Sequence, residues 1–522
     1  MPAHAIVHCA EDADVYQPAR EQFEALLATL HAPKTREMSQ DELEQLLLTE
    51  QRELMRRCLQ GHLDERATGV VASPVVDADG RAHRHQRQQK RKLETVFGTV
   101  TVSRIGFGGR GLPSLHPLDA ALNLPPTHHS HTVEWFVAEN AAKESFDEVV
   151  ATLGAYTAAK AAKRQTEEIT RRVAQDFNAF YEQERAASPE QAAGTGPVLV
   201  ITADGKGVPM IKRDLRPTTQ AAAKTRKPRF THRLSKGEKK GFKRMATVAA
   251  VYTIKDWRRT PDQIIRELEA KPREVEPRPR PEDKRVWASL AQPPEEVIAQ
   301  AFEEASRRDP EKRKEWVALS DGNKLQLGLL LAASADAGVK LTIILDLIHV
   351  LEYLWRAARA FYQEGDQRAE AWVGNRLLAI LQGRSSLVAA GIRRSATLLN
   401  LSPRARLPVD KCADYLLKYR DFLRYDEYLA AGYPIATRVI EGACRYLVKD
   451  RMELTGARWS LAGAESVLRL RALRASGDFA PYWKFHLEQE RKRHHAKRYA
   501  DGQPPTIKYA PEPEMPRLRL VN

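Results

Sequence analysis

Three carboxylates in this sequence have the side-chain type and the setting that hold divalent metal ions. Asp204 and Asp346 each end an apolar run, and Glu441 opens a basic amphipathic stretch. Hard ions such as Mg²⁺ prefer carboxylate oxygens, and a pair of such ions roughly 4 Å apart stabilises both the attacking and the leaving oxygen in phosphoryl transfer. We therefore predict a metal-assisted phosphoryl-transfer site with Asp204, Asp346 and Glu441 as catalytic ligands of two Mg²⁺ or Mn²⁺ ions.

Neighbouring residues leave alternatives open. A single Asp at a strand end is often a turn or cap residue, and Asp321, which also ends a strand before a glycine, is the runner-up for the second acid. His349 lies on the same helical face as Asp346. It is a catalytic candidate that orients the acid, contacts the substrate or transfers a proton, and its alternative is a packed or capping histidine. Lys206 is predicted to neutralise a phosphate beside the metals.

Composition indicates a polyanionic partner. The chain of 522 residues has 83 Lys+Arg against 68 Asp+Glu, a formal net charge of +15, and charge of this sign favours nucleic acid. The alternative is a ribosome-associated or merely basic protein. The four cysteines form no Cys-x-x-Cys pair, which argues against a zinc finger and fits a reducing cytoplasm. No apolar stretch is long enough to span a bilayer, so we expect a cytoplasmic, nucleoid-associated protein without a membrane partner.

The N-terminal region, residues 1–130, is predicted to be helical and then β-hairpin. Leucines at helical spacing over 17–66 indicate helices that Pro33 separates. Alternation with a period of two around Phe97-Gly98 indicates two strands after the basic run 83–92. We expect this basic hairpin either to contact phosphates or to form a solvated edge of the sheet.

Residues 131–195 are predicted to be a helical DNA-binding region. Ser145 and Glu148 have the spacing of a capping box, and Gly154 permits a turn before a second, basic helix. This is the outline of a helix-turn-helix, although any helical hairpin shares it. Its predicted phosphate contacts are Lys160, Lys163 and Arg164.

Residues 196–476 are predicted to form the catalytic domain. Apolar runs indicate strands ending near Asp204, Ile254, Asp321 and Asp346, with a helix before the last. This order is that of an RNase H-like core. Three kinds of region are not expected to belong to this core. The basic stretch 211–244 is predicted to be a loop that clamps phosphates, and residues of about 256–310 and 360–432 are predicted to be insertions. Residues 477–522 are predicted to be a basic tail that is disordered beyond residue 491.

The stretch after Glu441 is predicted to be a basic helix. Arg445, four residues on, pairs with Glu441 or contacts DNA. Lys449 and Arg451 are predicted to lie against the DNA backbone. Trp459 is expected to pack against the C-terminal helix.

Several sequence blocks together resemble the Kra-type insertion-sequence transposases, over roughly residues 60–476. The blocks are Asp204-Gly-Lys-Gly-Val208, Leu345-Asp-Leu-Ile-His-Val-Leu-Glu-Tyr-Leu-Trp355, Val439-Ile-Glu-Gly-Ala-Cys-Arg445, Gly456-Ala-Arg-Trp459, Gly463-Ala-Glu465 and Leu93-Glu-Thr-Val-Phe-Gly98. The resemblance implies a DDE transposase with an RNase H-like domain, and the triad Asp204, Asp346 and Glu441. It also implies an Asp-x-x-His pattern at Asp346–His349 and double-stranded terminal inverted repeats as substrate.

The sequence thus predicts an α+β multidomain protein, with a helical and β-hairpin DNA-binding region followed by an RNase H-like catalytic domain with helical insertions. Its predicted function is cleavage of element ends and their transfer to target DNA by a dimer or higher assembly. The alternatives are a divalent-metal DNA nuclease without strand transfer and a non-catalytic DNA-binding derivative.

Overall fold

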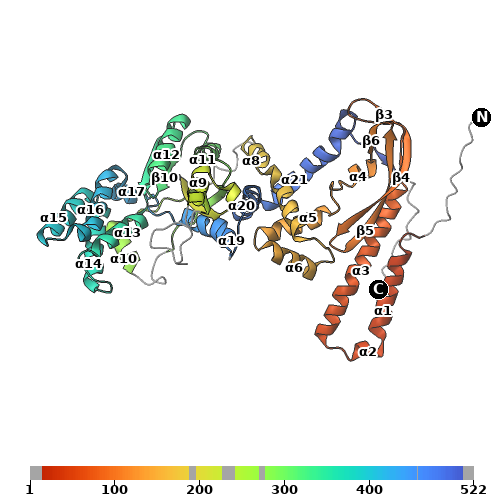
Figure 1. Cartoon of the computed structure of the whole chain (residues 1–522), viewed down its shortest axis with the longest axis horizontal. Coiled ribbons are helices and arrows are strands. Elements are labelled where there is room, and N and C mark those ends of the chain that lie inside the picture. Colours follow the sequence, from red (N-terminus) through yellow and green to blue (C-terminus); the bar gives the residue numbers. More distant parts are fainter. Residues whose placement is uncertain (1–13, 187–194, 226–241, 270–276, 455, 510–522) are drawn as a thin grey trace, which may run out of the picture. The chain divides into compact units, whose positions relative to one another are not determined.

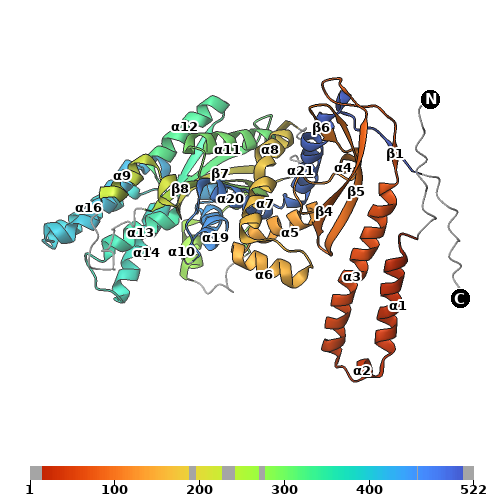
Figure 2. The same ribbon diagram turned by 45° about the vertical axis from the view of Figure 1, so that its right-hand side comes forward.

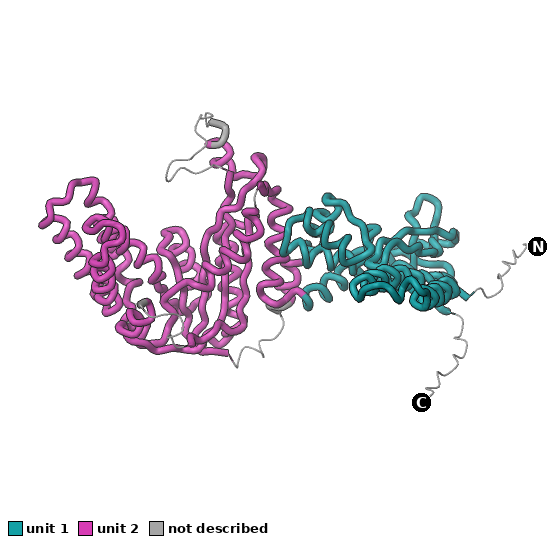
Figure 3. Tube along the Cα trace, turned by 90° about the horizontal axis from the view of Figure 1, so that it is seen from below, with its two compact units in different colours: residues 1–176, 480–522 teal, residues 177–479 magenta. Residues whose placement is uncertain are grey.

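The chain divides into two compact units. The computed structural model describes residues 14–186, 195–225, 242–269, 277–454 and 456–509 (Figure 1). One unit comprises residues 1–176 and 480–522, and the other residues 177–479 (Figure 3). Helices and strands occur in both units, and the largest sheet is mixed, so the chain is a mixed α/β protein. In the ranges just given, no helix is long and apolar enough to cross a membrane.

The first unit begins with a helical hairpin that packs beside a twisted β-hairpin (Figure 2). Helix α3 starts at a capping box in which Ser39 and Glu42 satisfy each other's backbone N–H groups. The predicted separation of helices at Pro33 is confirmed. The elements are α1 (Gln17–His31), α2 (Pro33–Arg36), α3 (Gln40–Ala67), β1 (Val70–Val71), β2 (Val75–Val76), β3 (Ala82–His83), β4 (His85–Thr95), β5 (Gly98–Gly109), β6 (Leu112–Leu115) and α4 (Pro117–Ala121).

The predicted β-hairpin is confirmed, with longer strands than expected. Strands β4 and β5 pair antiparallel from His85↔Gly108 to Thr95↔Gly98. Gly98 closes the turn with φ +113, a conformation that side chains oppose. One face of the hairpin buries Leu93, Val100 and Val102 in a core cluster. Lys90 and Lys92 alternate onto the other face and are exposed, whereas Arg91 lies on the same face as Leu93 and is partly buried.

Three short helices follow in this unit: α5 (His131–Ala141), α6 (Phe146–Tyr156) and α7 (Lys163–Val173). The predicted capping box is present, because Ser145 and Glu148 exchange hydrogen bonds at the start of α6. Gly154 is not the turn, since α6 continues through it and the chain turns only after Tyr156. The helix-turn-helix function of α6 and α7 stays a prediction.

The C-terminal segment belongs to this first unit and is folded through residue 509. Helix α21 (Phe479–His494) contributes Tyr482, whose hydroxyl donates to the Val173 carbonyl. Strand β12 (Ile507–Lys508) pairs with β1. The predicted disorder beyond residue 491 is therefore wrong up to residue 509, because aromatic side chains of α21 anchor a basic segment. Residues 510–522 lie outside the described ranges.

The second unit has a five-stranded sheet in the order β11-β10-β7-β8-β9. Strand β7 (Val198–Pro209) is central, with β10 (Glu315–Ser320) parallel on one side and β8 (Lys243–Ile254) antiparallel on the other. Strand β11 (Leu341–Leu345) extends the parallel side. These strands are nearly continuous apolar runs because helices cover both faces of the sheet.

The fifth strand, β9 (Glu282–Ser289), corrects the prediction that residues 256–310 are an insertion. It pairs antiparallel with β8 and forms the other edge of the sheet. Helix α11 (Pro294–Arg308) follows and packs on β7 and β8. The prediction failed because β9 starts with charged residues, whereas its buried half is only Arg285 to Ser289. Arg285 is buried against Glu304, an ion pair that periodicity does not reveal.

The remaining helices of this unit pack on the sheet or on one another. The stretch 347–430, predicted to be helical, is helical, and its status as an insertion at 360–432 stays a prediction. The elements are α8 (Phe177–Ala186), α9 (Pro217–Thr225), α10 (Pro261–Glu269), α12 (Lys324–Ala337), α13 (Leu347–Ala358), α14 (Gln367–Leu381), α15 (Ser385–Leu398), α16 (Pro403–Lys418), α17 (Tyr425–Ala431), α18 (Arg438–Ala443), η6 (Cys444–Lys449), α19 (Asp450–Met452) and α20 (Leu461–Ser476). Most of the predicted clamp at 211–244, residues 226–241, lies outside the described ranges.

Helix α20 holds the end of β9 through one buried carboxylate. Glu465, 7% exposed, accepts hydrogen bonds from the Ser289 hydroxyl (2.7 Å) and from the N–H groups of Leu290 (2.8 Å) and Ala291 (3.2 Å). Ser289 and Leu290 are themselves buried. Glu465 therefore fixes the position of the edge strand.

We expect Glu465→Ala to lower the free energy of unfolding by about 3 kcal/mol, because it leaves buried donors without an acceptor. Urea unfolding followed by circular dichroism measures the change. The matched control is Glu296→Ala, which removes an exposed carboxylate of α11. Equal unfolding midpoints for the two variants would contradict the capping role.

Candidate active site

Asp204 lies within β7, at the point where one neighbouring strand stops. Strand β10 pairs with β7 only as far as Leu319↔Thr202, whereas β8 pairs with β7 to its end. The sequence suggested that the strand ends at Asp204, but pairing with β8 carries it on to Pro209. Asp204 therefore occupies a half-open edge of the sheet, where a carboxylate need not be enclosed by strands on both sides.

Asp346 directly follows β11 and starts α13. Its N–H donates to the Ser320 carbonyl (2.9 Å), which fixes it beside the end of β10. Its carboxylate caps α13 by accepting from the Ile348 N–H (3.1 Å). The same carboxylate accepts from the Thr437 N–H (3.2 Å) and hydroxyl (2.6 Å). Asp346 is 3% exposed, so these bonds replace water.

Thr437 is the N-cap residue of α18, the helix that carries Glu441. The Leu347 N–H also donates to the Ile435 carbonyl (2.9 Å), which adds a second link between the two segments. These bonds bring Glu441 to the sheet edge, although 95 residues separate it from Asp346 in the sequence (441 − 346). Sequence reasoning did not identify Thr437, because a threonine before a helix is an ordinary cap.

Electrostatics indicate that the three acids lie near one another. Burial raises the pKa of Glu441, and the carboxylates of Asp346 and Asp204 raise it further. Burial likewise raises the pKa of Asp204, although the Gly205 N–H (2.6 Å) donates to it. Asp321 adds a repulsive contribution to the pKa of Asp204. Carboxylates are thus concentrated at this edge of the sheet, and the hydrogen-bond donors beside Asp204 do not fully offset their mutual repulsion.

The Cys444 thiol donates to the Asp204 carboxylate at 3.4 Å. Burial, with Asp204 beside it, raises the pKa of this thiol, so it stays protonated and remains a donor. Cys444 begins a π-helical segment, η6, which continues the helix of Glu441. Its spacing of three residues from Glu441 places both on one helical face, and this was the signal that the sequence offered.

The predicted triad has a ligand set that fits hard divalent ions, since all of its donors are carboxylate oxygens. One oxygen of Asp346 accepts a single hydrogen bond, which leaves a lone pair for another partner. The three acids are nevertheless not drawn tightly together. Among the described residues, the group whose ligand atoms lie within 4.8 Å of one another is Asp176, His486 and Glu490, in the other unit.

The buried group in the first unit already has a cation. Arg493 forms ion pairs with both Asp176 and Glu490. His486 lies 2.7 Å from Asp176, Nδ1 to Oδ2. This arrangement anchors α21 to the short helix η1 (Ala174–Asp176). Because the carboxylates have a guanidinium partner, the group is explained as a structural ion-pair network.

His349 packs among aromatic rings near the triad. Its ring centroid lies 5.4 Å from that of Tyr353 and 5.9 Å from that of Tyr415. With Asp321 it lines a pocket of about 390 Å³ between α13, α16 and the end of β10. Asp321 accepts from the Asn323 N–H (2.8 Å), as expected of a turn residue. The catalytic role of His349 stays a prediction.

The basic residues around Glu441 divide into exposed and buried ones. Lys206 lies on β7 and lowers the pKa of Asp204. Arg445 is 80% exposed and lies nearest Asp450 (3.9 Å), so its predicted pairing with Glu441 is not present. Lys449 is exposed. Lys206, Arg445 and Lys449 thus remain available for phosphate contact.

Arg451 contradicts its predicted contact with the DNA backbone. It is 2% exposed, and its guanidinium lies 4.8 Å from the ring centroid of Trp459. Trp459 is itself buried, as expected. The prediction extended an α-helical period through residues that form a π-helix. A π-turn holds more residues than an α-turn, so every later side chain points in a different direction.

The predicted phosphate contacts of the first unit are at the start of α7. Lys163 pairs with Asp147 (2.6 Å) and Arg164 with Glu168 (3.0 Å), both on the surface. Lys160 is exposed in the preceding loop. Exposed ion pairs contribute at most about 1 kcal/mol, so they do not prevent a phosphate contact, which stays a prediction.

Comparisons with known proteins identify no family. No protein-family model matches the chain, and no curated protein matches it. A solved structure described as the Drosophila P element transposase strand transfer complex is similar at 10% sequence identity and a TM-score of 0.22. This similarity covers 67% of this chain and 80% of that chain. Similarity at this level defines neither a shared fold nor an activity.

We expect Asp204→Asn to unfold at the same temperature as the unmodified protein, or a higher one, at pH 7 without added metal. The variant removes a charge that burial and Asp321 disfavour. Because the folded-state pKa of Asp204 is raised, its charge lowers stability above that pKa. The difference between the two proteins should vanish as the pH falls below the pKa of an unfolded-state carboxyl. Thermal melts from pH 3 to pH 8 measure it.

The matched control is Asp309→Asn, in the same unit. Asp309 is 4% exposed and accepts from the N–H groups of Arg313 (2.8 Å) and Lys314 (2.9 Å) and from the Trp316 indole (2.8 Å). The amide cannot replace all of these acceptors, so this variant should lose about 1–3 kcal/mol of stability. Equal destabilisation by both variants would contradict the view that the charge of Asp204 lowers the stability of the folded protein.

Proposed function

We propose that this chain is a metal-dependent DNA transposase whose second unit is an RNase H-like catalytic domain. The observation that carries the proposal is the meeting of Asp204, Asp346 and Glu441 at one edge of a mixed five-stranded sheet. Asp204 lies on β7 and Asp346 directly follows β11, the two parallel strands on either side of β10, and Glu441 comes from a later helix. The strand order, with only the second strand in sequence antiparallel to the others, supports the RNase H-like part of this proposal.

Each residue has a defined part in the proposed chemistry. Asp204, Asp346 and Glu441 hold two Mg²⁺ or Mn²⁺ ions, which stabilise the attacking and leaving oxygens when bound. Thr437 orients Asp346, and Cys444 orients Asp204 by donating to it. Bound cations also relieve the repulsion that raises the pKa values of Asp204 and Glu441.

The finer assignment is a Kra-type insertion-sequence transposase. The sequence blocks around the three acids support it, together with a net charge of +15. Its substrates are then double-stranded terminal inverted repeats and target DNA. The proposal places the half-buried Lys206 and the exposed Arg445 and Lys449 along the backbone of the cleaved strand. Bringing two element ends together requires a dimer or a higher assembly, in the cytoplasm at the nucleoid.

The second candidate is a divalent-metal DNA nuclease without strand transfer, since it shares the same acids. Joining assays separate the two functions, because only a transposase attaches the freed 3′-hydroxyl to target DNA. A non-catalytic DNA-binding derivative is less well supported, because all three acids are intact.

We expect Asp204→Ala, Asp346→Ala and Glu441→Ala each to reduce excision by on the order of 10³-fold, since each removes a ligand of the metals that stabilise the reacting oxygens. Excision is measured in cells on a marker flanked by the element's own ends. The control is Asp321→Ala, a neighbouring acid outside the triad. Retained excision in Glu441→Ala, with protein levels unchanged, would contradict the triad.

DNA binding should weaken steeply with salt. A protein that neutralises six or more phosphates loses about 10³-fold in affinity between 50 mM and 200 mM salt, because bound counterions are released. Filter binding of the element's ends over this range measures the slope, with Mg²⁺ replaced by Ca²⁺ to prevent cleavage. An affinity that does not change with salt would contradict the proposed backbone contacts.

A further inference from the structure

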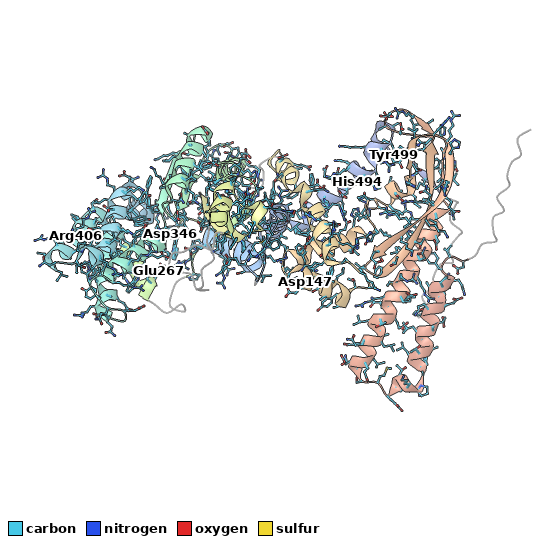
Figure 4. The ribbon with its side chains drawn as sticks, viewed as in Figure 1. Asp147, Glu267, Asp346, Arg406, His494 and Tyr499 are labelled. Carbon is cyan, nitrogen blue, oxygen red and sulfur yellow. The ribbon has the colours of Figure 1, made fainter. Side chains whose placement is uncertain are left out.

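The first unit contains a cationic pocket that the proposed function does not use. Its volume is about 360 Å³, and it lies between β4, β5, the segment before α5 and the residues after α21. Its walls include Arg91, Arg104 and Arg498, together with the single carboxylate Asp119. Figure 4 labels two further wall residues, His494 and Tyr499.

The charges in this pocket do not balance. Arg104 forms an ion pair with Asp119, and Arg91 shares the same carboxylate at 3.8 Å. Arg498 donates to the Ser114 carbonyl (2.8 Å) and forms no ion pair within the described part of the chain. Three guanidinium groups thus face one carboxylate. Arg493, which also lines the pocket, is already paired with two carboxylates of its own.

Two of the three guanidinium groups are largely shielded from water, and Arg498 is half-buried. The side chains of Arg91 and Arg104 are 17% and 13% exposed. Burial lowers the pKa of Arg91; Asp119 and Glu134 oppose this effect, and Arg104 adds to it. Burial lowers the pKa of His116 to about 4, so this wall residue is neutral at pH 7. Retaining unbalanced buried charge is unfavourable unless an anion compensates it.

The arginines are also held in position. Arg91 donates to the carbonyls of Pro125 and Thr127, and Arg498 to that of Ser114. Guanidinium groups fixed in this way present rigid pairs of donors, which match the oxygens of a phosphate. The volume exceeds that of inorganic phosphate and lies in the range of small-ligand pockets.

We propose that this pocket binds the phosphate of a nucleotide, with Arg91, Arg104 and Arg498 as its ligands. A nucleoside phosphate comes from two sources: a residue of a DNA strand, or a free nucleotide. The DNA source rests on the proposed function, whereas the phosphate site itself does not. Arg498 is the most informative residue, because no carboxylate in the described structure neutralises it.

The test uses the full-length protein and isothermal titration calorimetry with three probes: inorganic phosphate, deoxyadenosine monophosphate and a deoxyadenosine hexanucleotide. Arg498→Ala should weaken binding about tenfold, the usual consequence of losing one charged hydrogen-bonding group. The matched control, Lys497→Ala, removes an equal charge from the adjacent exposed residue and should leave affinity unchanged. Arg498→Lys keeps the charge without the paired donors and should give an intermediate affinity, which guards against misfolding of the alanine variant.

The probes separate the sources. A tenfold loss confined to the hexanucleotide supports a DNA strand as the ligand, and a loss confined to the mononucleotide or phosphate supports a free ligand. Failure of all three probes to bind the unmodified protein, or identical affinities for Arg498→Ala and Lys497→Ala, would overturn the site. Asp204→Ala should bind every probe normally, so inactivity at the acids is distinguishable from failure of the pocket.

Discussion

The hydrogen bonds between Asp346 and Thr437 connect the end of the sheet to the helix that carries Glu441. Between these two acids the chain makes the helices α14 to α17, so nothing in local structure holds them together. The carboxylate of Asp346 serves two backbone segments at once, because it caps α13 and binds the N-cap residue of α18. The bond from the Leu347 N–H to the Ile435 carbonyl and the packing of α18 on β7 and β8 add to this link. The proposed triad therefore depends on a residue that has no reactive role of its own.

The same edge of the sheet is also where negative charge is least compensated. Asp204 is half-buried, and its pKa and that of Glu441 are raised by burial and by neighbouring carboxylates. Other carboxylates of this unit are stabilised instead. Glu465 and Asp309, for example, each accept hydrogen bonds from several buried donors. The first unit shows the opposite imbalance, since its pocket gathers arginines around Asp119. Both sites are places where the protein holds like charges together, and both are explained most simply by a ligand of opposite charge.

Much of the fold could be predicted from periodicity. The helices of residues 17–66, the hairpin around Gly98 and four of the five strands of the large sheet follow from apolar spacing and from caps. Strand β9 could not be found in this way, because half of it is charged and Arg285 is buried by an ion pair. The C-terminal segment looked disordered because it is basic, yet aromatic residues of α21 anchor it. Arg451 was assigned to the surface because nothing in the sequence announces a π-turn.

By itself, the sequence determined which side chains are available for chemistry: three acids in distinctive settings and a large excess of basic residues. Only the tertiary structure decided how they combine. It placed Asp204 inside a strand, brought Thr437 and Cys444 to the acids, and turned Arg451 inward. It also gathered Arg91, Arg104 and Arg498 from distant parts of the chain around one carboxylate. The physical reason is that periodicity reports burial along one element, whereas hydrogen bonds and charge balance depend on which elements meet.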